Sequence, residues 1–425
     1  MNNKRTWMKL DNAAKIYPAV MTRTWTALFR VSATLNEEID AEILEVAARD
    51  TINRFPAFAK KLKKGLFWYY LEHIDEPISI QEDVGNPCMR MNLKENNGYM
   101  LRIRYYGKRI AVEFFHVLTD GTGGMTFLKT LVARYIMLKY NILFEYTHGV
   151  LNCGDEPDDG ESEDSFLRYA RDTSRSRKEE AAYNIPGINE HHFMNIVTGM
   201  AESTRVLEEA KKYNATLTEY LTSELIMAVD HVQRAHVSSR KKYKPVKICV
   251  PINLRRFYNT KTIRNFASYT NPGIEPKYGQ YTLDETVKIV KGHFGMEMDE
   301  KLLNAKFSTN VQSENNKLLS IAPLFIKRWA LKLVYSFKGD RQTSTVLSNL
   351  GVITLPQGMD KYVERVDFML GPLKRNRVTC ACASYNGTLY INFTRTIKEA
   401  YVERNFFTSL VKKGIHVKIE SNQRW

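Results

Sequence analysis

Residues 114–124 read Phe-Phe-His-Val-Leu-Thr-Asp-Gly-Thr-Gly-Gly, an apolar segment that breaks into a glycine-rich turn. The pattern predicts a strand that ends at His116, with Asp120 and Gly121 in the loop that follows. An imidazole exchanges protons near neutral pH, so a histidine at a strand end with an aspartate nearby suits acid–base catalysis. The alternative is structural, with a core histidine at a strand end and an ordinary Asp-Gly turn.

The bulk composition is typical of a soluble globular protein. The chain has 425 residues, 44% of them hydrophobic and 26% charged, which is enough for two or three domains. No apolar run approaches the ~20 residues needed to cross a bilayer. The first residues are polar rather than a signal-peptide core, so we expect a cytoplasmic protein. The five cysteines are scattered and lack zinc-ligand spacing, which predicts neither a disulfide framework nor a metal site.

The net charge is +15, although residues 155–164 contain seven acidic residues and no basic one. A positive field of this kind favours polyanionic partners: nucleic acid, acidic lipid or a phosphorylated cofactor. The basic clusters, such as Lys60–Lys64, are not accompanied by a helix-turn-helix, a zinc finger or an RNA-binding aromatic strand. We therefore do not expect nucleic acid to be the partner.

The acidic segment divides the chain into two lobes. We expect a first lobe over residues 1–150, an exposed and partly mobile charged connector over residues 151–189, and a second lobe over residues 190–425. Both lobes mix helices and strands, which predicts an α+β fold.

Local patterns place several elements within the lobes. Helical spacing predicts helices over 44–55, capped by Asp40, and over 128–136. Alternation predicts strands over 101–105 and 108–115, joined at Gly107. In the second lobe, Thr216 and Glu219 form a capping-box pattern. We also expect a strand over 246–250 that stops at Pro251, and a hairpin turning at Asn386-Gly387.

Several segments together resemble one known group. The sequence His-Val-Leu-Thr-Asp-Gly at 116–121 resembles the HxxxDG signature of the CoA-dependent acyltransferase superfamily, which includes chloramphenicol acetyltransferase, the plant BAHD enzymes and condensation domains. The segments at 7–18, 54–58 and 65–70 are similar to the bacterial alcohol acetyltransferase-like branch. So are those at 250–255, 262–266, 348–351 and 367–371, and they follow in the same order.

The resemblance covers residues 7 to about 415 and implies an architecture. It implies two chloramphenicol-acetyltransferase-like lobes, each a mixed sheet with flanking helices, and an active-site tunnel between them. One segment departs from the pattern, because residues 367–371 read Asp-Phe-Met-Leu-Gly where many relatives have Asp-Phe-Gly-Trp-Gly. This change affects what the resemblance implies about binding of the acyl donor more than what it implies about the reaction.

The resemblance also assigns roles to residues. It implies that His116 is the general base, that Asp120 turns away from the ring, and that Arg255 pairs with Asp120 through a bidentate contact across the lobes. A catalytic role for Asp120, orienting the imidazole, is the alternative. Gly121, with Gly123 and Gly124, would allow a close approach to substrate or simply form a tight turn. Ser348 or Asn349 is a candidate donor to an oxyanion, or else part of a strand-end turn.

The function implied is acyl transfer from acyl-CoA to the hydroxyl, or the amine, of a small acceptor. Acyl-CoA would be a co-substrate, with no tightly bound cofactor and no covalent enzyme intermediate. One alternative is a free-standing condensation-type enzyme that takes the acyl group from an acidic carrier protein. Another is a non-catalytic protein that binds a carrier or another partner on the same scaffold.

Overall fold

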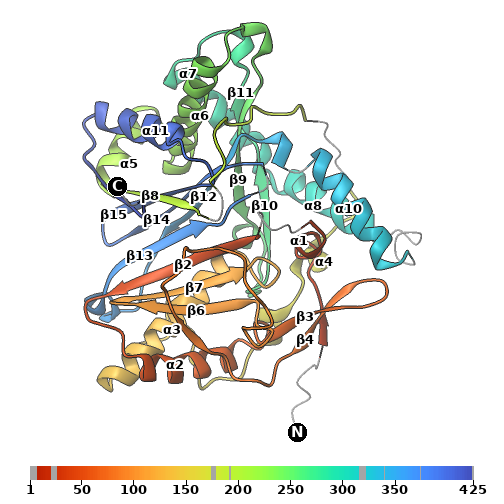
Figure 1. The fold of residues 1–425 in the computed structure, drawn as a ribbon, viewed down its shortest axis with the longest axis vertical. Coiled ribbons are helices and arrows are strands. Elements are labelled where there is room, and N and C mark those ends of the chain that lie inside the picture. The colour runs from red at the N-terminus through yellow and green to blue at the C-terminus, as the bar shows by residue number, and fades with distance from the viewer. Residues whose placement is uncertain are drawn as a thin grey trace.

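The computed structural model describes residues 7–20, 26–173, 179–190, 193–314, 322–338, 340–373 and 375–423. Figure 1 shows two β-sheet lobes, one above the other, with helices on their outer sides. This is the mixed α/β, two-lobed architecture that the sequence predicts. Within the described residues, no helix is both long and apolar enough to cross a membrane.

The first lobe is built on a five-stranded sheet in the order β13-β2-β7-β6-β5. Its strands are β2 (Leu28–Leu35), β5 (Ile80–Glu82), β6 (Leu101–Tyr106), β7 (Arg109–Phe115) and β13 (Val363–Leu370). Helices α2 (Ala41–Arg54) and α3 (Gly121–Tyr140) pack together, with α3 against β2 and β7. A second, three-stranded sheet contains β1 (Trp7–Lys9), β3 (Lys60–Lys64) and β4 (Tyr69–His73), and the short helix α1 (Ile16–Val20) follows β1.

The second lobe is built on an eight-stranded sheet. Seven strands lie in the order β10-β9-β12-β14-β15-β8-β16, and the eighth, β11, also pairs with β9. Its strands are β8 (Asn195–Glu202), β9 (Val246–Asn253), β10 (Ala267–Thr270), β11 (Gly273–Ile274), β12 (Thr345–Val352), β14 (Val378–Tyr385), β15 (Thr388–Arg395) and β16 (Val417–Ser421). Its helices are α5 (Ser203–Lys212), α6 (Leu217–His236), α7 (Leu283–Glu297), α8 (Glu300–Glu314), α10 (Leu324–Lys338) and α11 (Tyr401–Lys412).

Single helical turns complete the described chain. They are α4 (Ser165–Tyr169), η1 (Asp159–Ser162), η2 (Arg240–Lys242), η3 (Leu254–Arg256), η4 (Pro276–Tyr278), η5 (Asp340–Gln342) and η6 (Met359–Tyr362).

Many local predictions are confirmed. Asp40 caps α2 by accepting from the backbone of residues 42 and 43, and Thr216 and Glu219 form a capping box at α6. Gly107, with φ of 53°, joins β6 to β7. Asn386 and Gly387, with φ of 45° and 77°, join β14 to β15, as expected for a turn that needs two left-handed residues.

The expected end of a strand at Pro251 is wrong, because β9 continues to Asn253. Pro251 lies opposite Tyr269 of β10, whereas the pairing of β9 with β12 reaches only Cys249. The missing N–H of Pro251 therefore costs no hydrogen bond on the β12 side, and a proline is tolerated there.

The division of the chain into consecutive lobes also needs correction. Strand β13 lies within the range expected to form the second lobe, but it pairs antiparallel with β2 of the first sheet from Val363 to Leu370. In Figure 1 this strand runs beside β2, between the two lobes. The second half of the chain therefore supplies an edge strand of the first sheet and ties the lobes together.

The expectation of an exposed connector over 151–189 holds for the start of its acidic part, where Asp155, Glu156, Asp158 and Asp159 are exposed, but not for residues 161–166. Residues 174–178 lie outside the described residues. Glu161 is buried and binds both terminal nitrogens of Arg54 at 2.7 Å, and Phe166 is buried against Phe266 and Phe307. Glu161 thus binds the first lobe, whereas Asp158 and Glu163 accept hydrogen bonds from Lys261 and Thr260 of the second. The segment therefore packs against both lobes and does not only link them.

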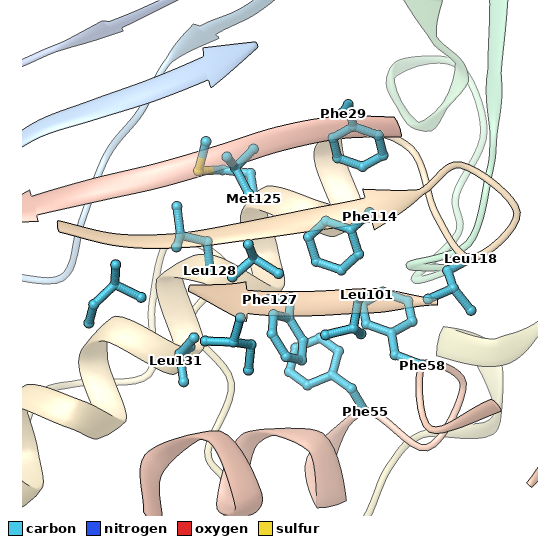
Figure 2. Close-up of a cluster of buried hydrophobic side chains, with 14 of the residues drawn as sticks. Phe29, Phe55, Phe58, Leu101, Phe114, Leu118, Met125, Phe127, Leu128 and Leu131 are labelled. Atoms are coloured by element: carbon cyan, nitrogen blue, oxygen red, sulfur yellow. The ribbon is translucent and has the colours of Figure 1, made fainter. Parts of the chain in front are cut away.

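Each lobe has its own hydrophobic core. In the second lobe, Cys380 and Cys382 are buried core residues. In the first lobe, an aromatic cluster lies under the end of β7, and Figure 2 shows Phe29, Phe114 and Phe127 within it. The ring of Phe114 is 5.3 Å from that of Phe29 and 5.6 Å from that of Phe127. This packing fixes the strand that leads to His116.

Candidate active site

His116 directly follows β7, and its backbone N–H donates to the carbonyl of Ala27 at 2.9 Å. Its ring stacks on Tyr17 of α1, with centroids 4.8 Å apart, and meets the edge of Phe29 at 5.3 Å. The neighbouring Phe115 and Val117 are buried, but His116 is partly exposed. The imidazole is thus held on two sides by aromatic rings, in a residue that as a whole is not fully buried.

The protonation pattern of the ring is fixed by Asn265. The side-chain amide of Asn265 donates to the carboxylate of Asp11 at 3.1 Å and to the carbonyl of His116 at 3.0 Å. Its Oδ1 therefore faces His116 Nδ1, 2.9 Å away, as an acceptor. Nδ1 must carry the proton that Oδ1 accepts, so the lone pair of the neutral ring is on Nε2.

Asp11 is the buried end of this chain of hydrogen bonds. Besides Asn265, it accepts from the backbone N–H of Ala14 at 2.7 Å, and Arg264 lies 3.6 Å away. Burial raises the pKa of Asp11 to about 6, although Arg264 opposes the shift. At pH 7 a pKa of about 6 leaves Asp11 mostly ionised, able to hold the Asn265 amide in place.

The pKa of His116 is lowered below the ordinary 6.5. Burial disfavours the charged imidazolium and outweighs Asp120, Asn265 and the backbone of His116 itself, which all raise the pKa. The ring is consequently neutral at pH 7. A neutral imidazole with its lone pair on Nε2 can accept a proton.

The hydrogen bonds of Asp120 go to the backbone and to Arg255, not to the ring of His116. It caps α3, with Oδ1 accepting from the N–H groups of Thr122 and Gly123, each at 3.1 Å. Its Oδ2 accepts from the backbone of Phe266 at 2.9 Å and from Arg255 at 2.8 Å. The predicted loop at residues 120–124 is therefore wrong. The helix begins at Gly121, because an aspartate just before it satisfies the first backbone donors.

The expected pairing of Arg255 with Asp120 is present across the lobes, but it is not bidentate. Only Nη1 of Arg255 reaches Asp120. Nε donates to the carbonyl of Thr262 at 2.8 Å, and Nη2 donates to the carbonyl of Arg264. Because Asp120 Oδ1 is occupied by the helix cap, one oxygen remains for the arginine, whose other nitrogens shape the 262–264 loop.

The three glycines at the start of α3 serve packing. None has a positive φ, so tight-turn geometry does not explain them. A Cβ on Gly123 would lie 2.1 Å from the carbonyl oxygen of Ile263, and one on Gly124 would lie 2.7 Å from the ring of Phe29. A Cβ on Gly121 would lie 2.9 Å from Leu350. These glycines therefore allow close contact with residues of the protein itself, which come from both lobes.

The two oxyanion candidates lie on opposite faces of β12. Ser348 pairs with Ala381 of β14, whose side chain belongs to the first lobe's core, whereas Asn349 pairs with Cys382 of the second core. Asn349 Nδ2 donates to the hydroxyl of Thr218 at the start of α6, 3.0 Å away. Only Ser348 therefore faces the lobe that carries His116.

Sequence reasoning missed Asn265 and Asp11. Both lie in segments that carry the resemblance, at 262–266 and 7–18, but neither had been given a role. Asn265 is 149 residues from His116 and Asp11 is 254 residues from Asn265. Among the described residues, no group of three His, Cys, Asp or Glu side chains is arranged to hold a metal ion.

Comparisons with known proteins give the fold. No family model and no curated protein sequence matches the chain. Several solved structures do. One is the TRI3 trichothecene 15-O-acetyltransferase of Fusarium sporotrichioides, with 12% identity over 96% of this chain and 94% of that one, and a TM-score of 0.62. Another is TRI101 of F. graminearum in complex with coenzyme A and T-2 mycotoxin, with 10% identity over 97% and 99% and a TM-score of 0.62.

The first condensation domain of the calcium-dependent antibiotic synthetase, bound to a substrate analogue, is also similar. It has 12% identity over 98% of this chain and 100% of that domain, with a TM-score of 0.61. The likeness extends over nearly the whole length of each chain. This protein therefore has the two-lobed fold of the acetyltransferase and condensation-domain structures, as the HxxxDG resemblance implied.

Proposed function

We propose that the protein transfers an acyl group from acyl-CoA to the hydroxyl group of a small acceptor, with His116 as the general base. The observation that carries the proposal is the hydrogen bond between His116 Nδ1 and Asn265 Oδ1, which leaves the lone pair of a neutral imidazole on Nε2. The shared fold with an O-acetyltransferase, and with a protein crystallised with coenzyme A, supports the substrate class.

The chemistry needs few groups. Nε2 of His116 takes the proton of the acceptor hydroxyl as its oxygen attacks the thioester carbonyl carbon. The carbon–sulfur bond then breaks, and the proton on Nε2 passes to the departing CoA sulfur. The products are an ester and free CoA, and the imidazole is neutral again. An amine acceptor would react in the same way and give an amide.

The remaining residues have supporting roles in this proposal. Ser348 is the candidate donor to the oxyanion, because its face of β12 is directed to the lobe that carries His116. Asp120 and Arg255 hold the start of α3 against the 262–264 loop and so position Asn265. Substrates would enter by a passage between the lobes, as the resemblance implies.

A thiol-release screen tests the proposal. Short and long acyl-CoAs are offered with pools of alcohols and amines, and free CoA is measured. We expect His116→Ala to lower the rate by about 10²–10⁴-fold, the usual contribution of a general base. The matched control is His231→Ala, an exposed histidine of α6, which should keep the activity. Circular dichroism confirms that both variants fold.

The alternatives give different outcomes. If His116→Ala releases CoA as fast as the wild type, the imidazole is not the base. If the wild type releases no CoA from any acyl-CoA but transfers an acyl group from an acidic carrier protein, the condensation-type function replaces the proposed one. The similarity to a condensation domain is the observation that favours this alternative. Silence with both donors would leave a binding protein on this scaffold.

A further inference from the structure

Large apolar side chains are exposed together where α10 meets the turn between β3 and β4. Leu66 in the turn is 73% exposed, and Phe325 and Trp329 on α10 are 71% and 67% exposed. Phe67 and Ile326 beside them are also exposed. We call these five residues the α10 platform. Clusters of exposed aromatic and aliphatic side chains on a folded protein mark interaction sites more often than chance.

The two parts of the platform are fixed to each other. The backbone N–H of Leu324 donates to the carbonyl of Leu66 at 2.9 Å. Lys327, on the inner face of α10, donates to the carbonyl of Phe67 at 3.1 Å, and its Nζ lies 3.5 Å from the ring centre of Trp68. The turn and the start of α10 therefore present their apolar side chains as one rigid surface rather than as two independent loops.

The surroundings of the platform are basic. Residues 60–68 and 322–332 contain seven basic residues and no acidic one. Two of the seven, Lys60 and Lys327, are buried, and five are at least partly exposed: Lys61, Lys63, Lys64, Arg328 and Lys332. Lys64 and Lys332 are exposed beside the apolar side chains. Lys61 and Lys63 lie near Glu72, which offsets part of their charge, so the positive field is strongest at the turn and along α10.

From this combination we propose that the α10 platform docks on an anionic lipid membrane. A helix that exposes phenylalanine, tryptophan and isoleucine on one face, with a basic residue such as Lys332 at its border, is typical of segments that lie in a membrane interface. The apolar side chains leave water, and the lysines meet the negative surface. Figure 1 shows α10 and the β3–β4 turn projecting from the edge of the molecule, a shape suited to a flat surface.

The platform lies close to the candidate active site. Helix α1 packs against α10, and Tyr17 of α1 stacks on His116. Docking would bring a lipid surface beside the element that holds the imidazole. The inference does not rest on acyl transfer, because lipid binding is measured without any reaction.

Vesicle sedimentation tests the inference. Full-length protein is mixed with vesicles of equal parts phosphatidylglycerol and phosphatidylcholine, or of phosphatidylcholine alone. We expect binding to the anionic vesicles, weakened by salt, and little binding to the neutral ones. Phe325→Ser combined with Trp329→Ser should reduce binding by about tenfold or more, because both side chains enter the interface. Leu143→Ser removes an apolar side chain that is 84% exposed elsewhere and should bind like the wild type.

Three outcomes would overturn the inference. The first is no binding of wild-type protein to anionic vesicles. The second is equal binding by the wild type and the double variant, since lysines alone would then account for it. The third is a wild-type protein that does not bind vesicles but forms dimers in sedimentation velocity or binds an acidic carrier protein. In this outcome the double variant neither forms dimers nor binds the carrier protein. The platform would then be a protein interface.

Discussion

At the scale of single residues, the imidazole of His116 is oriented by an asparagine rather than by the aspartate of its own motif. Both carboxylate oxygens of Asp120 accept hydrogen bonds from the start of α3, Phe266 and Arg255, and neither binds the ring. Asn265 fixes Nδ1 as a donor, and Asp11 holds Asn265. The uncharged Asn265 raises the pKa of His116 less than burial lowers it, so the ring stays neutral, whereas a carboxylate at the same place would favour the cation more strongly.

The sequence predicted His116 and the pairing of Asp120 with Arg255, because the motif and the resemblance name those positions. It could not predict Asn265. The hydrogen bond to His116 spans 149 residues, and an asparagine in the segment Arg264-Asn265-Phe266 has no local signature of such a role. Only the fold brings the two side chains together.

Asn265 is thus a positioning residue, and its variants should change both rate and pH dependence. The hydrogen bond from Nδ1 raises the pKa of His116, so Asn265→Ala should lower that pKa further and move the acid limb of kcat/KM to lower pH. The rate should also fall by about 10–100-fold, because the ring loses its orientation and tautomer.

Asn265→Asp keeps an acceptor for Nδ1 but adds negative charge, so it should move the acid limb to higher pH. The measurement is the profile of kcat/KM from pH 5 to 8 for the wild type and both variants. A fall in rate with no movement of the acid limb in either variant would mean that Asn265 only supports the fold.

At the scale of elements, the start of α3 is the feature that local patterns misjudged. The run Asp-Gly-Thr-Gly-Gly has the composition of a loop, because glycine disfavours helices. The structure continues the helix through it, since the cap of Asp120 stabilises the first turn and the missing side chains allow Ile263 and Phe29 to approach. Tertiary packing outweighs local propensity here.

Gly123→Ala should therefore destabilise the protein, against the usual preference of helices for alanine. The new Cβ would lie 2.1 Å from the Ile263 oxygen, and forced overpacking of this kind costs about 1–3 kcal/mol. Gly292 in α7 is the matched control, because nothing lies within 4 Å of its Cβ position. Gly292→Ala should stabilise the protein by about 0.5–1 kcal/mol.

Urea unfolding of the two variants measures both effects. If Gly123→Ala is as stable as Gly292→Ala, the first turn of α3 does not pack as closely as described.

At the scale of the whole molecule, the two lobes are joined by long-range contacts that composition does not reveal. The mixed α/β class and most element positions follow from local periodicity and turns. The pairing of β13 with β2 could not be predicted in this way, because the sequence of an edge strand does not show which strand it pairs with. The acidic segment indicated an exposed connector, but Glu161 pairs with Arg54, 107 residues away, and is buried.

The ion pair of Asp120 with Arg255 also joins the lobes, and removing its charge should be costly. Asp120→Asn keeps an oxygen to cap α3 but leaves Arg255, whose side chain is only 13% exposed, without its counter-ion, and removing one partner of such a pair costs up to about 3–5 kcal/mol. The control is Asp284→Asn, which disrupts the exposed pair with Lys288 and should cost less than about 1 kcal/mol.

Denaturant unfolding, followed by circular dichroism, compares the two substitutions. Equal and small losses would show that the pair across the lobes contributes no more than a surface contact.

The most direct measurement of the central claim is a pH titration of the imidazole nitrogens by NMR, on protein labelled with ¹⁵N in its nine histidines. The signals of His116 are identified by their loss in His116→Gln. We predict a neutral ring at pH 7 with the proton on Nδ1 and a bare Nε2, and a pKa below 6.5. A proton on Nε2 at pH 7, whether on the other neutral tautomer or on the imidazolium, would contradict the account.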